Sequence, residues 1–229
     1  MTWSAFLLSC CATLAVTVPR VGAAYLNGID VSRYQGQIDW AAVARNVSFV
    51  SIKATEGATF TDPSFAVNWA GAHANGLIRT AYHFAHPSVS AYAQADYFVD
   101  AVNSAGGYTN SSTMQLMLDL EDADKESPAV VWAWVQDFSA RVKARTGRPL
   151  LMYTGYYFWT GSVGDPTDNL DAPLWIAAYI PKPLIPKAWG GVWTFWQHAD
   201  NGRVPGITGN VDLDYFNGTE EDLRALCFP

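Results

Sequence analysis

Two carboxylates separated by one apolar residue stand at the end of an apolar run near the middle of the chain. The run continues into Asp119-Leu120-Glu121. Strand side chains two apart point to the same face, so Asp119 and Glu121 should project together, with Leu120 directed the other way. Repulsion and desolvation then favour one protonated and one ionised member, the condition for general acid catalysis. Glycosidic cleavage needs this pairing, because the leaving oxygen takes a proton while positive charge develops on the sugar.

Such a pair could also be an ordinary polar strand end that begins a loop, so the prediction depends on acids elsewhere in the chain. Asp30 ends the first expected strand and could hydrogen-bond into the pair, although an Asp before Ser32 could equally form a turn. Asp212 and Asp214 repeat the two-residue spacing, and one could face the site while the other caps a turn. Together these acids predict one acidic centre, with Glu121, Asp119 and Asp30 as its catalytic residues and Asp212 beside the substrate.

Other side chains at expected strand ends are candidates for substrate binding. Glu56 could accept sugar hydroxyls or pair with Lys53. His83 is predicted to hydrogen-bond rather than to bind metal, because the spacing to His86 would place the two rings on opposite faces of a strand. We therefore expect no metal and no cofactor. The remaining candidates are Gln197 and the aromatic residues that could stack on sugar faces: Tyr82, Tyr153, Trp175, Tyr179 and Trp196.

Short strand-like runs alternate with helix-period segments through the first two thirds of the chain, and from residue 172 onward short Pro- and Gly-rich connections replace the helices. Eight strands with five intervening helical segments predict an α/β fold, a modified, trimmed TIM-like barrel in a single domain. In such barrels reactive groups sit at the C-terminal strand ends. The alternative is a doubly wound open sheet, but no phosphate-binding glycine pattern follows the first strand. The expected strands are 27–31, 49–54, 78–84, 115–121, 150–154, 174–179, 192–198 and 210–215.

Capping residues mark the ends of several expected helices. Asp62-Pro63 and Ser127-Pro128 each place a capping side chain before a proline at the first helical position. Gly76 and Gly147 are natural helix stops.

Residues 1–24 are expected to form a signal peptide. An apolar run at 5–18 is too short to span a bilayer, and small residues at 21–24 suit cleavage after Ala23 or Ala24, with an uncleaved anchor as the alternative. The mature chain, residues 25–229, would then be a secreted, extracellular catalytic barrel. It would keep Cys227 as its one cysteine and form no internal disulfide.

The charge of the chain limits the class of partner. A net charge of −7 without any basic run argues against nucleic acid and anionic membranes. We expect a monomer, with no membrane contact once the leader is removed.

Six blocks of this sequence resemble, in order, those of family 25 glycoside hydrolases, the Chalaropsis-type lysozymes. The resemblance covers residues 26–217, and its blocks are 30–36, 53–57, 82–84, 118–121, 196–197 and 211–216. It implies a (βα)5β3 barrel that hydrolyses the β-1,4 bond between N-acetylmuramic acid and N-acetylglucosamine in the glycan strands of peptidoglycan. It also implies that Glu121 is the acid, Asp119 its partner carboxylate, and Asp30 and Asp212 the acids of the first and last blocks. Asp214 departs from the family, which more often has Asn there.

Three other functions remain as alternatives. A family 18 chitinase would share the barrel, but its D-x-D-x-E pattern needs an acid where Met117 stands. A polysaccharide deacetylase would need the histidines as metal ligands. A non-catalytic protein that binds peptidoglycan or chitin could keep the cleft without cleaving the glycan.

Overall fold

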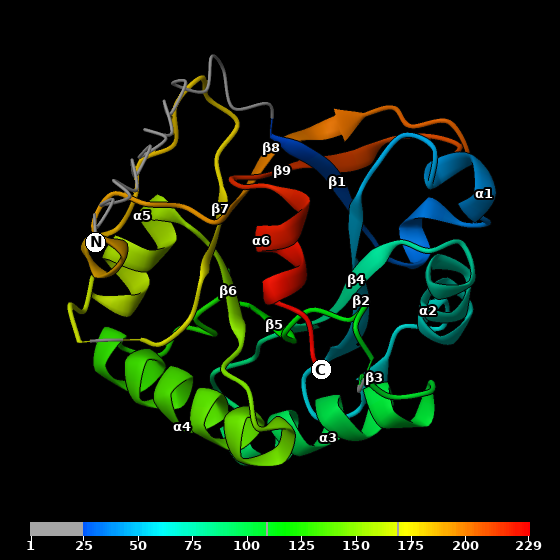
Figure 1. The fold of residues 1–229 in the computed structure, drawn as a ribbon. Coiled ribbons are helices and arrows are strands. Elements are labelled where there is room, and N and C mark those ends of the chain that lie inside the picture. Colours follow the sequence, from blue (N-terminus) through cyan, green and yellow to red (C-terminus); the bar gives the residue numbers. More distant parts are fainter. Residues whose placement is uncertain (1–24, 109, 169) are drawn as a thin grey trace, which may run out of the picture.

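The computed structural model describes residues 25–108, 110–168 and 170–229, so the expected leader lies outside the described residues. Eight strands close into a barrel in the order β1-β9-β8-β7-β6-β5-β4-β2, and β2 pairs back onto β1 (Figure 1). Neighbouring strands are parallel except for β9, which is antiparallel to both β8 and β1. The barrel strands are β1 Leu26–Val31, β2 Phe49–Glu56, β4 Ile78–Phe84, β5 Met117–Asp119, β6 Leu151–Gly155, β7 Leu174–Ala177, β8 Phe195–Gly202 and β9 Val211–Phe216. A short strand, β3 Phe60–Thr61, folds back onto the end of β2.

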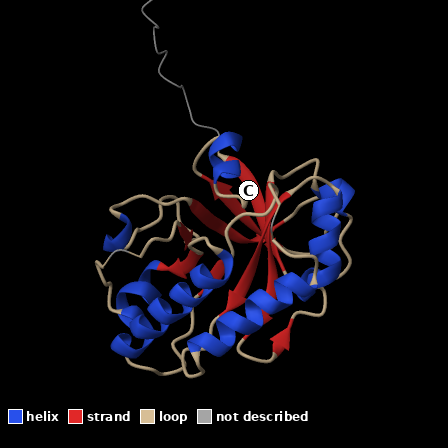
Figure 2. Cartoon of the chain, turned by 60° about the horizontal axis from the view of Figure 1, so that its bottom comes forward, coloured by secondary structure: helices blue, strands red, loops and turns tan. Residues whose placement is uncertain are grey.

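Helical segments connect the first six barrel strands and pack along the outside of the barrel (Figure 2). They are α1 Trp40–Val43, α2 Phe65–Ala74, α3 Ala91–Ser104, α4 Pro128–Thr146, and α5 Tyr156–Phe158 with the π-helical turn Trp159–Val163. Beyond β7, the described connections hold only 3₁₀ turns and loops before β9. This order confirms the predicted (βα)5β3 barrel.

The barrel separates two apolar cores. One lies between the strands and the surrounding helices and contains Ile52, Phe98 and Phe138. The other fills the barrel itself, where the rings of Trp175 and Phe195 stack with centroids 4.2 Å apart. Because parallel strands are buried on both faces, their sequences are nearly continuous apolar runs.

Gly28 on β1 leaves space for an aromatic ring inside the barrel. A Cβ atom at Gly28 would lie 2.2 Å from the ring of Phe49, its register partner on β2. Gly28→Ala should therefore lower the free energy of unfolding by about 1–3 kcal/mol, as overpacking does in other cores. Urea unfolding measures this, with Gly161→Ala as the control because a Cβ there meets no atom within 4 Å. Equal stability of the two variants would contradict this packing.

A C-terminal helix, α6 Glu220–Ala225, closes one end of the barrel and stands at the centre of the ring of strands in Figure 1. It begins at a capping box formed by Thr219 and Asp222. Leu223 and Cys227 are buried in the barrel core, and the amide of Gln115 donates to the carbonyl of Leu226 at 2.9 Å. Gln115 precedes β5, so α6 lies at the N-terminal strand ends and the opposite end remains the mouth of the barrel.

The structure corrects several predicted element boundaries. β5 spans only Met117–Asp119 instead of 115–121, which places Glu121 in the loop after the strand. α2 begins at Phe65 rather than at Pro63, and the carboxylate of Asp62 accepts from the backbone amides of Ser64 and Arg33 instead. α4 does begin with a proline, but the Ser127 side chain before it makes no capping hydrogen bond, and Gly147 ends the helix in the left-handed conformation at φ 75°. No helix in the described ranges has the length and apolar character needed to cross a membrane.

Candidate active site

Asp119 and Glu121 meet at the mouth of the barrel, as the alternation of strand side chains predicts. Asp119 is the last residue of β5 and is only 6% exposed, whereas Glu121 is exposed to solvent. Leu120 between them is fully buried against the helices. Its amide donates to the carbonyl of Tyr153 at 3.0 Å, so hydrogen bonding to β6 continues one residue past β5. The Glu121 side chain is therefore held on the same side as that of Asp119.

Both carboxyls hold protons more strongly than ordinary acids. Burial, followed by the charge of Glu121, raises the pKa of Asp119 well above its usual value, while the Lys53 ammonium acts in the opposite direction. No hydrogen bond within the described structure reaches Asp119 Oδ1, although that atom is buried. Partial desolvation raises the pKa of Glu121, with Lys53 again opposing the shift. The pair therefore keeps a proton at pH values where isolated carboxyls have lost theirs.

A second acidic cluster lies across the mouth on β1 and β9. Asp30 stands opposite Asp212 in the register of the two strands, and Asp214 lies one inward position below Asp212. Asp212 is half-buried and Asp214 is only 1% exposed, where its Oδ1 accepts from Trp175 Nε1 at 2.8 Å. Both Asp212 and Asp214 thus face inward, and Asp212 is the one at the rim.

Gln197 on β8 joins this cluster to the tyrosines of the mouth. Its amide nitrogen donates to Asp30 Oδ2 at 2.7 Å, and its Oε1 accepts from the hydroxyls of Tyr153 at 2.9 Å and Tyr179 at 2.7 Å. Gln197 thus turns its oxygen to the two tyrosines and its nitrogen to Asp30. Burial raises the pKa of Tyr153 well above its usual value, and that of Tyr82 as well, so both phenols stay neutral.

Three of the predicted substrate-binding residues lie outside the mouth. His83 is fully buried against the helices, between Thr55 Oγ1 at 2.8 Å and Gln94 Oε1 at 3.0 Å, and burial lowers its pKa to about 3. Trp175 is fully buried inside the barrel below the acids. These two side chains support the site without facing a ligand at its surface.

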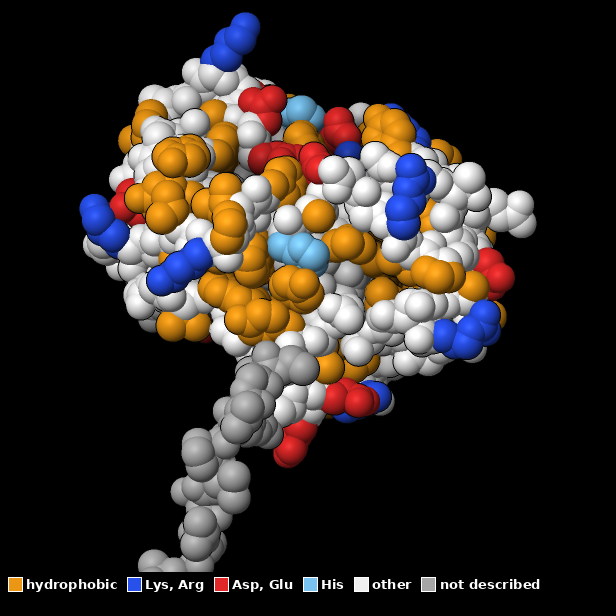
Figure 3. All heavy atoms as spheres, turned by 90° about the horizontal axis from the view of Figure 1, so that it is seen from above, with side chains coloured by type: hydrophobic (Ala, Val, Ile, Leu, Met, Phe, Trp, Pro, Cys, Tyr) orange, Lys and Arg blue, Asp and Glu red, His pale blue; other side chains and the backbone are white. Residues whose placement is uncertain are grey.

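Trp196, the third, points away from the mouth because it is adjacent to Gln197 and neighbouring strand residues face opposite sides. Its indole nitrogen donates to the carbonyl of Ala178 at 2.7 Å, and its ring packs against Tyr215 and Trp193. Figure 3 views the molecule from the side of β8 and β9 and shows hydrophobic side chains gathered on this outer face.

The remaining candidate, Glu56, forms an ion pair at the rim rather than standing free. Its Oε2 accepts from Lys53 Nζ at 2.6 Å and its Oε1 lies 3.5 Å from His86 Nε2. His86 in turn contacts Asp124, which the sequence did not single out. Within the described ranges, no group of three or more His, Cys, Asp or Glu side chains is arranged to hold a metal ion.

The buried Asp214 carboxyl makes the stability of the protein depend on pH. Burial raises its pKa well above the usual value, and the charge of Asp212 adds to the rise. A carboxyl with a raised folded-state pKa stabilises the fold at low pH and loses that contribution as the pH rises through the folded pKa. Asp214→Asn removes this loss, while the amide oxygen can still accept from Trp175.

We therefore expect Asp214→Asn to be more stable than the wild type at pH 7 and to lose that advantage near pH 4. Each unit of pKa shift corresponds to about 1.4 kcal/mol, and about 1 kcal/mol moves the melting temperature by roughly 2–4 °C in a domain of this size. Thermal melts between pH 4 and 8 measure the difference. A gain that is the same at every pH, or a loss at pH 7, would contradict the assignment.

Comparisons with known proteins agree with this geometry. The model of the family described as glycosyl hydrolases family 25 matches residues 29–207. The chain is 38% identical over 220 residues to lysozyme M1 of Streptomyces globisporus, covering 92% of this chain and 74% of that protein. It is 36% identical to the N,O-diacetylmuramidase of Arthroderma benhamiae, covering 99% of this chain and 98% of that one.

Solved structures extend the similarity to three dimensions. The crystal structure of the bacterial lysozyme from Streptomyces coelicolor superposes with a TM-score of 0.84 at 37% sequence identity, covering 90% of this chain and 98% of the other. The barrel carries its acids at the C-terminal strand ends, and the similarity to these proteins covers most of the chain. The chain therefore belongs to glycosyl hydrolases family 25.

Proposed function

We propose that this protein is a secreted muramidase, which hydrolyses the β-1,4 bond between N-acetylmuramic acid and N-acetylglucosamine in peptidoglycan. The observation that carries the proposal is the pair of carboxyls at the barrel mouth, the buried Asp119 and the exposed Glu121, both with raised pKa values. The names of the related proteins, lysozyme and N,O-diacetylmuramidase, support the substrate class.

In this proposal Glu121 is the general acid. Its exposed position lets it reach the glycosidic oxygen of a bound chain, and its raised pKa favours the protonated form that a general acid needs. Its proton moves to the leaving oxygen as the bond to the anomeric carbon breaks. Water, which gives up a proton to Glu121, then attacks the anomeric carbon and breaks its bond to the N-acetyl oxygen or to Asp119, and the two successive displacements give retention of configuration.

Asp119 acts beside it in one of two ways. In the first, the substrate's own N-acetyl oxygen attacks the anomeric carbon, while Asp119 orients the amide and stabilises its positive charge. In the second, Asp119 attacks the anomeric carbon directly. We favour the first, because Asp119 keeps 6% of its surface exposed at the mouth, where the accessible part of its carboxyl can accept from a substrate N–H. A fluorinated sugar that lacks the N-acetyl group tests this, since a trapped adduct on Asp119 would favour direct attack.

The opposite side of the mouth supplies binding and orientation. Asp30 accepts a hydrogen bond from the Gln197 amide nitrogen, and the Tyr153 and Tyr179 hydroxyls donate to the oxygen of the same amide and hold it in place. Asp212 at the rim is positioned to accept sugar hydroxyls, and the half-exposed ring of Tyr179 offers an apolar face to a sugar.

The decisive assay is the release of new reducing ends from purified peptidoglycan, with chitin oligomers assayed in parallel. A muramidase releases them from peptidoglycan, and a chelator leaves the rate unchanged. Cleavage of chitin alone would identify a chitinase-like hydrolase. Binding to either polymer without new reducing ends would identify a non-catalytic glycan-binding protein.

Secretion is the second part of the proposal. The related lysozymes and muramidases, by their names, act on the cell wall, and the expected leader at 1–24 would deliver this chain there. Expression in the source cells followed by N-terminal sequencing of the extracellular protein should give a chain that starts after Ala23 or Ala24. Retention of the full chain in the cell would refute this part alone.

A further inference from the structure

The segment between Glu121 and α4 has a backbone conformation that must be held from outside. Asp124 and Lys125 are consecutive non-glycine residues in the left-handed region, at φ 50° and 68°. Such conformations are uncommon and persist at functional sites only where surrounding contacts enforce them. Because the segment begins next to Glu121, whatever holds it also determines where that carboxyl stands.

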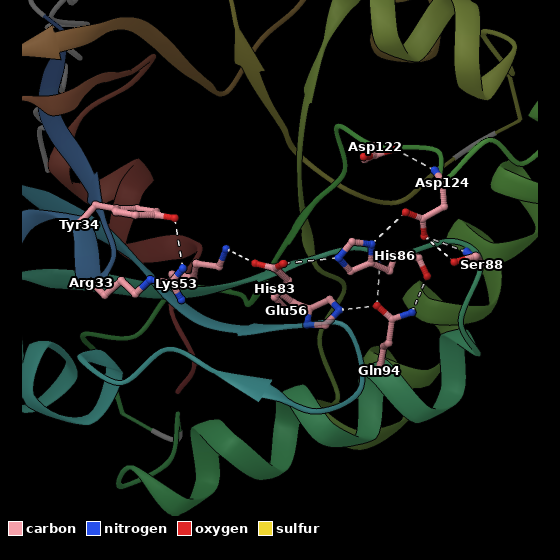
Figure 4. Close-up of polar contacts among 10 residues, drawn as sticks. All are labelled: Arg33, Tyr34, Lys53, Glu56, His83, His86, Ser88, Gln94, Asp122 and Asp124. Carbon is pink, nitrogen blue, oxygen red and sulfur yellow. Dashed lines mark hydrogen bonds and ion pairs between the residues drawn. The ribbon is translucent and has the colours of Figure 1, made fainter.

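The Asp124 side chain anchors this segment to the loop that follows β4. Its Oδ1 lies 2.9 Å from His86 Nδ1, and its Oδ2 accepts from the amide of Ser88 at 3.1 Å and from the Ser88 hydroxyl at 2.8 Å (Figure 4). Within the segment, Asp122 Oδ1 accepts from the Asp124 amide at 2.8 Å. The segment is thus held by two carboxylates, that of Asp124 through His86 and Ser88 and that of Asp122 through the Asp124 amide.

His86 is itself held firmly in place. Its amide donates to Gln94 Oε1 at 3.0 Å, and Gln94 Nε2 donates back to its carbonyl at 2.7 Å. Gln94 Oε1 also lies 3.0 Å from the buried His83 ring, which ties the arrangement to the strands. The far side of the His86 ring, Nε2, is 3.5 Å from Glu56 Oε1. Figure 4 shows the ring between Glu56 and Asp124.

From these contacts we propose that His86 is a positioning residue: its doubly protonated ring bridges Glu56 and Asp124 and so fixes Glu121 at the mouth. The inference rests on the proposed function, because it assigns a role around the acid of that reaction.

The bridge needs a charged ring because carboxylates only accept hydrogen bonds. A neutral imidazole has a single N–H and can serve one of the two acids, leaving the other beside a lone pair. The ionisable groups around the ring are Glu56 on β2, Asp124 beyond β5, the neutral His83 on β4, and Lys53, which is paired with Glu56. Burial acts to lower the pKa of His86, but Asp124 and then Glu56 outweigh it and raise that pKa above the usual value.

The same network reaches the catalytic pair electrostatically. Glu56 binds the Lys53 ammonium, which acts to lower the pKa of both Asp119 and Glu121. Loss of the His86 bridge would therefore leave the segment after Glu121 with its Ser88 contacts but without its tie to the ring, and would also free Glu56 to shift relative to Lys53. Both changes act on turnover rather than on the binding of distant sugar units.

The test compares His86→Gln with the matched control His73→Gln. His73 lies on α2 with its ring 3.3 Å from the Ser112 hydroxyl, away from the mouth. At acidic pH, where His86 is charged, we expect His86→Gln to lower kcat about 10- to 100-fold with little change in KM, as misplacement of a catalytic group does. Asp124→Asn should lower kcat at least as much, because it also disturbs the contacts with Ser88, and the double variant should be no worse than Asp124→Asn alone.

The pH dependence separates positioning from a merely structural role. The ratio of wild-type kcat to that of His86→Gln should fall towards one as the pH rises through the His86 pKa, because the wild-type ring then becomes neutral too. The variant can also change the pKa of Glu121 through Glu56 and Lys53, so the Glu121 step is fitted separately in the kcat–pH profile of each protein before the ratio is taken. A ratio that does not change with pH, a ratio near one at acidic pH, or an equal loss in His73→Gln would overturn the proposal.

Hydrogen exchange keeps the inference independent of the proposed activity. At acidic pH the backbone amides of residues 122–126 should exchange faster in His86→Gln than in the wild type, and at the wild-type rate in His73→Gln. Unchanged exchange in His86→Gln would overturn the proposal even if the enzyme is active. If the wild type released no reducing ends from peptidoglycan, the proposed function would fail, whereas the exchange result would still decide the role of His86.

Discussion

Glu121→Gln is expected to lower the rate of reducing-end release from peptidoglycan by about 10²–10⁴-fold, the usual contribution of a general acid. The amide keeps the shape of the side chain but has no proton to give to the leaving oxygen. The side chain is exposed and its carboxyl has a raised pKa, so its replacement should not lower the free energy of unfolding.

The control is Glu126→Gln, five residues further along the same loop, which should keep the wild-type rate. In the wild type, activity should fall as the pH rises through the raised pKa of Glu121, because only the protonated form can act. Turnover by Glu121→Gln close to that of the control would remove Glu121 from the mechanism.

Asp119→Asn should combine a large loss of activity with a gain in stability. The variant removes the negative charge that stabilises the developing positive charge, and the loss of one such preorganised electrostatic group costs about 10²–10³-fold in rate. It also removes a buried carboxyl whose pKa burial and Glu121 raise, and whose Oδ1 lacks a partner within the described structure. The stability gain should be largest at neutral pH, because a carboxyl with a raised folded-state pKa destabilises the fold as the pH rises.

Steady-state kinetics and thermal melts on the same samples measure both effects of Asp119→Asn. Asp137→Asn, on the exposed side of α4, is the matched control and should change neither property. An Asp119→Asn enzyme that is active, or one that is less stable than the wild type at pH 7, would contradict the assigned environment of this carboxyl.

The acids could be located from the sequence because their placement depends on local rules. Residues that alternate along a strand share a face, and strand ends in a β/α barrel lie at one mouth, so these two rules are enough to bring Asp119, Glu121 and Asp30 together. The barrel itself followed from the count of strands and helical segments. Both predictions use the spacing of apolar and polar residues along the chain, and the folded strands and helices keep that spacing.

The face that a strand-end residue presents was harder to predict, since it depends on the register of each strand. His83, Trp175 and Trp196 all lie near strand ends, yet the first faces the helices, the second is buried below the acids and the third faces outward. For Trp196 and Gln197 the alternation rule was available, because two adjacent strand residues cannot both face inward.

Contacts between loops could not be predicted from one sequence. His86 and Asp124 are 38 residues apart, and only the adjacency of β4 and β5 brings their loops together. The closure of the barrel by α6 also depends on tertiary packing, although the apolar Leu223, Cys227 and Phe228 near the C-terminus offered a usable signal.

Identification of the new reducing end tests the central claim most directly. Purified peptidoglycan is digested with the wild-type protein, the products are reduced with borohydride, and the reduced sugar is identified by mass spectrometry. The reduced form of N-acetylmuramic acid should appear with the wild type and be nearly absent with Glu121→Gln. Reduced N-acetylglucosamine instead, or equal product from both proteins, would contradict the assignment of a muramidase that uses Glu121 as its acid.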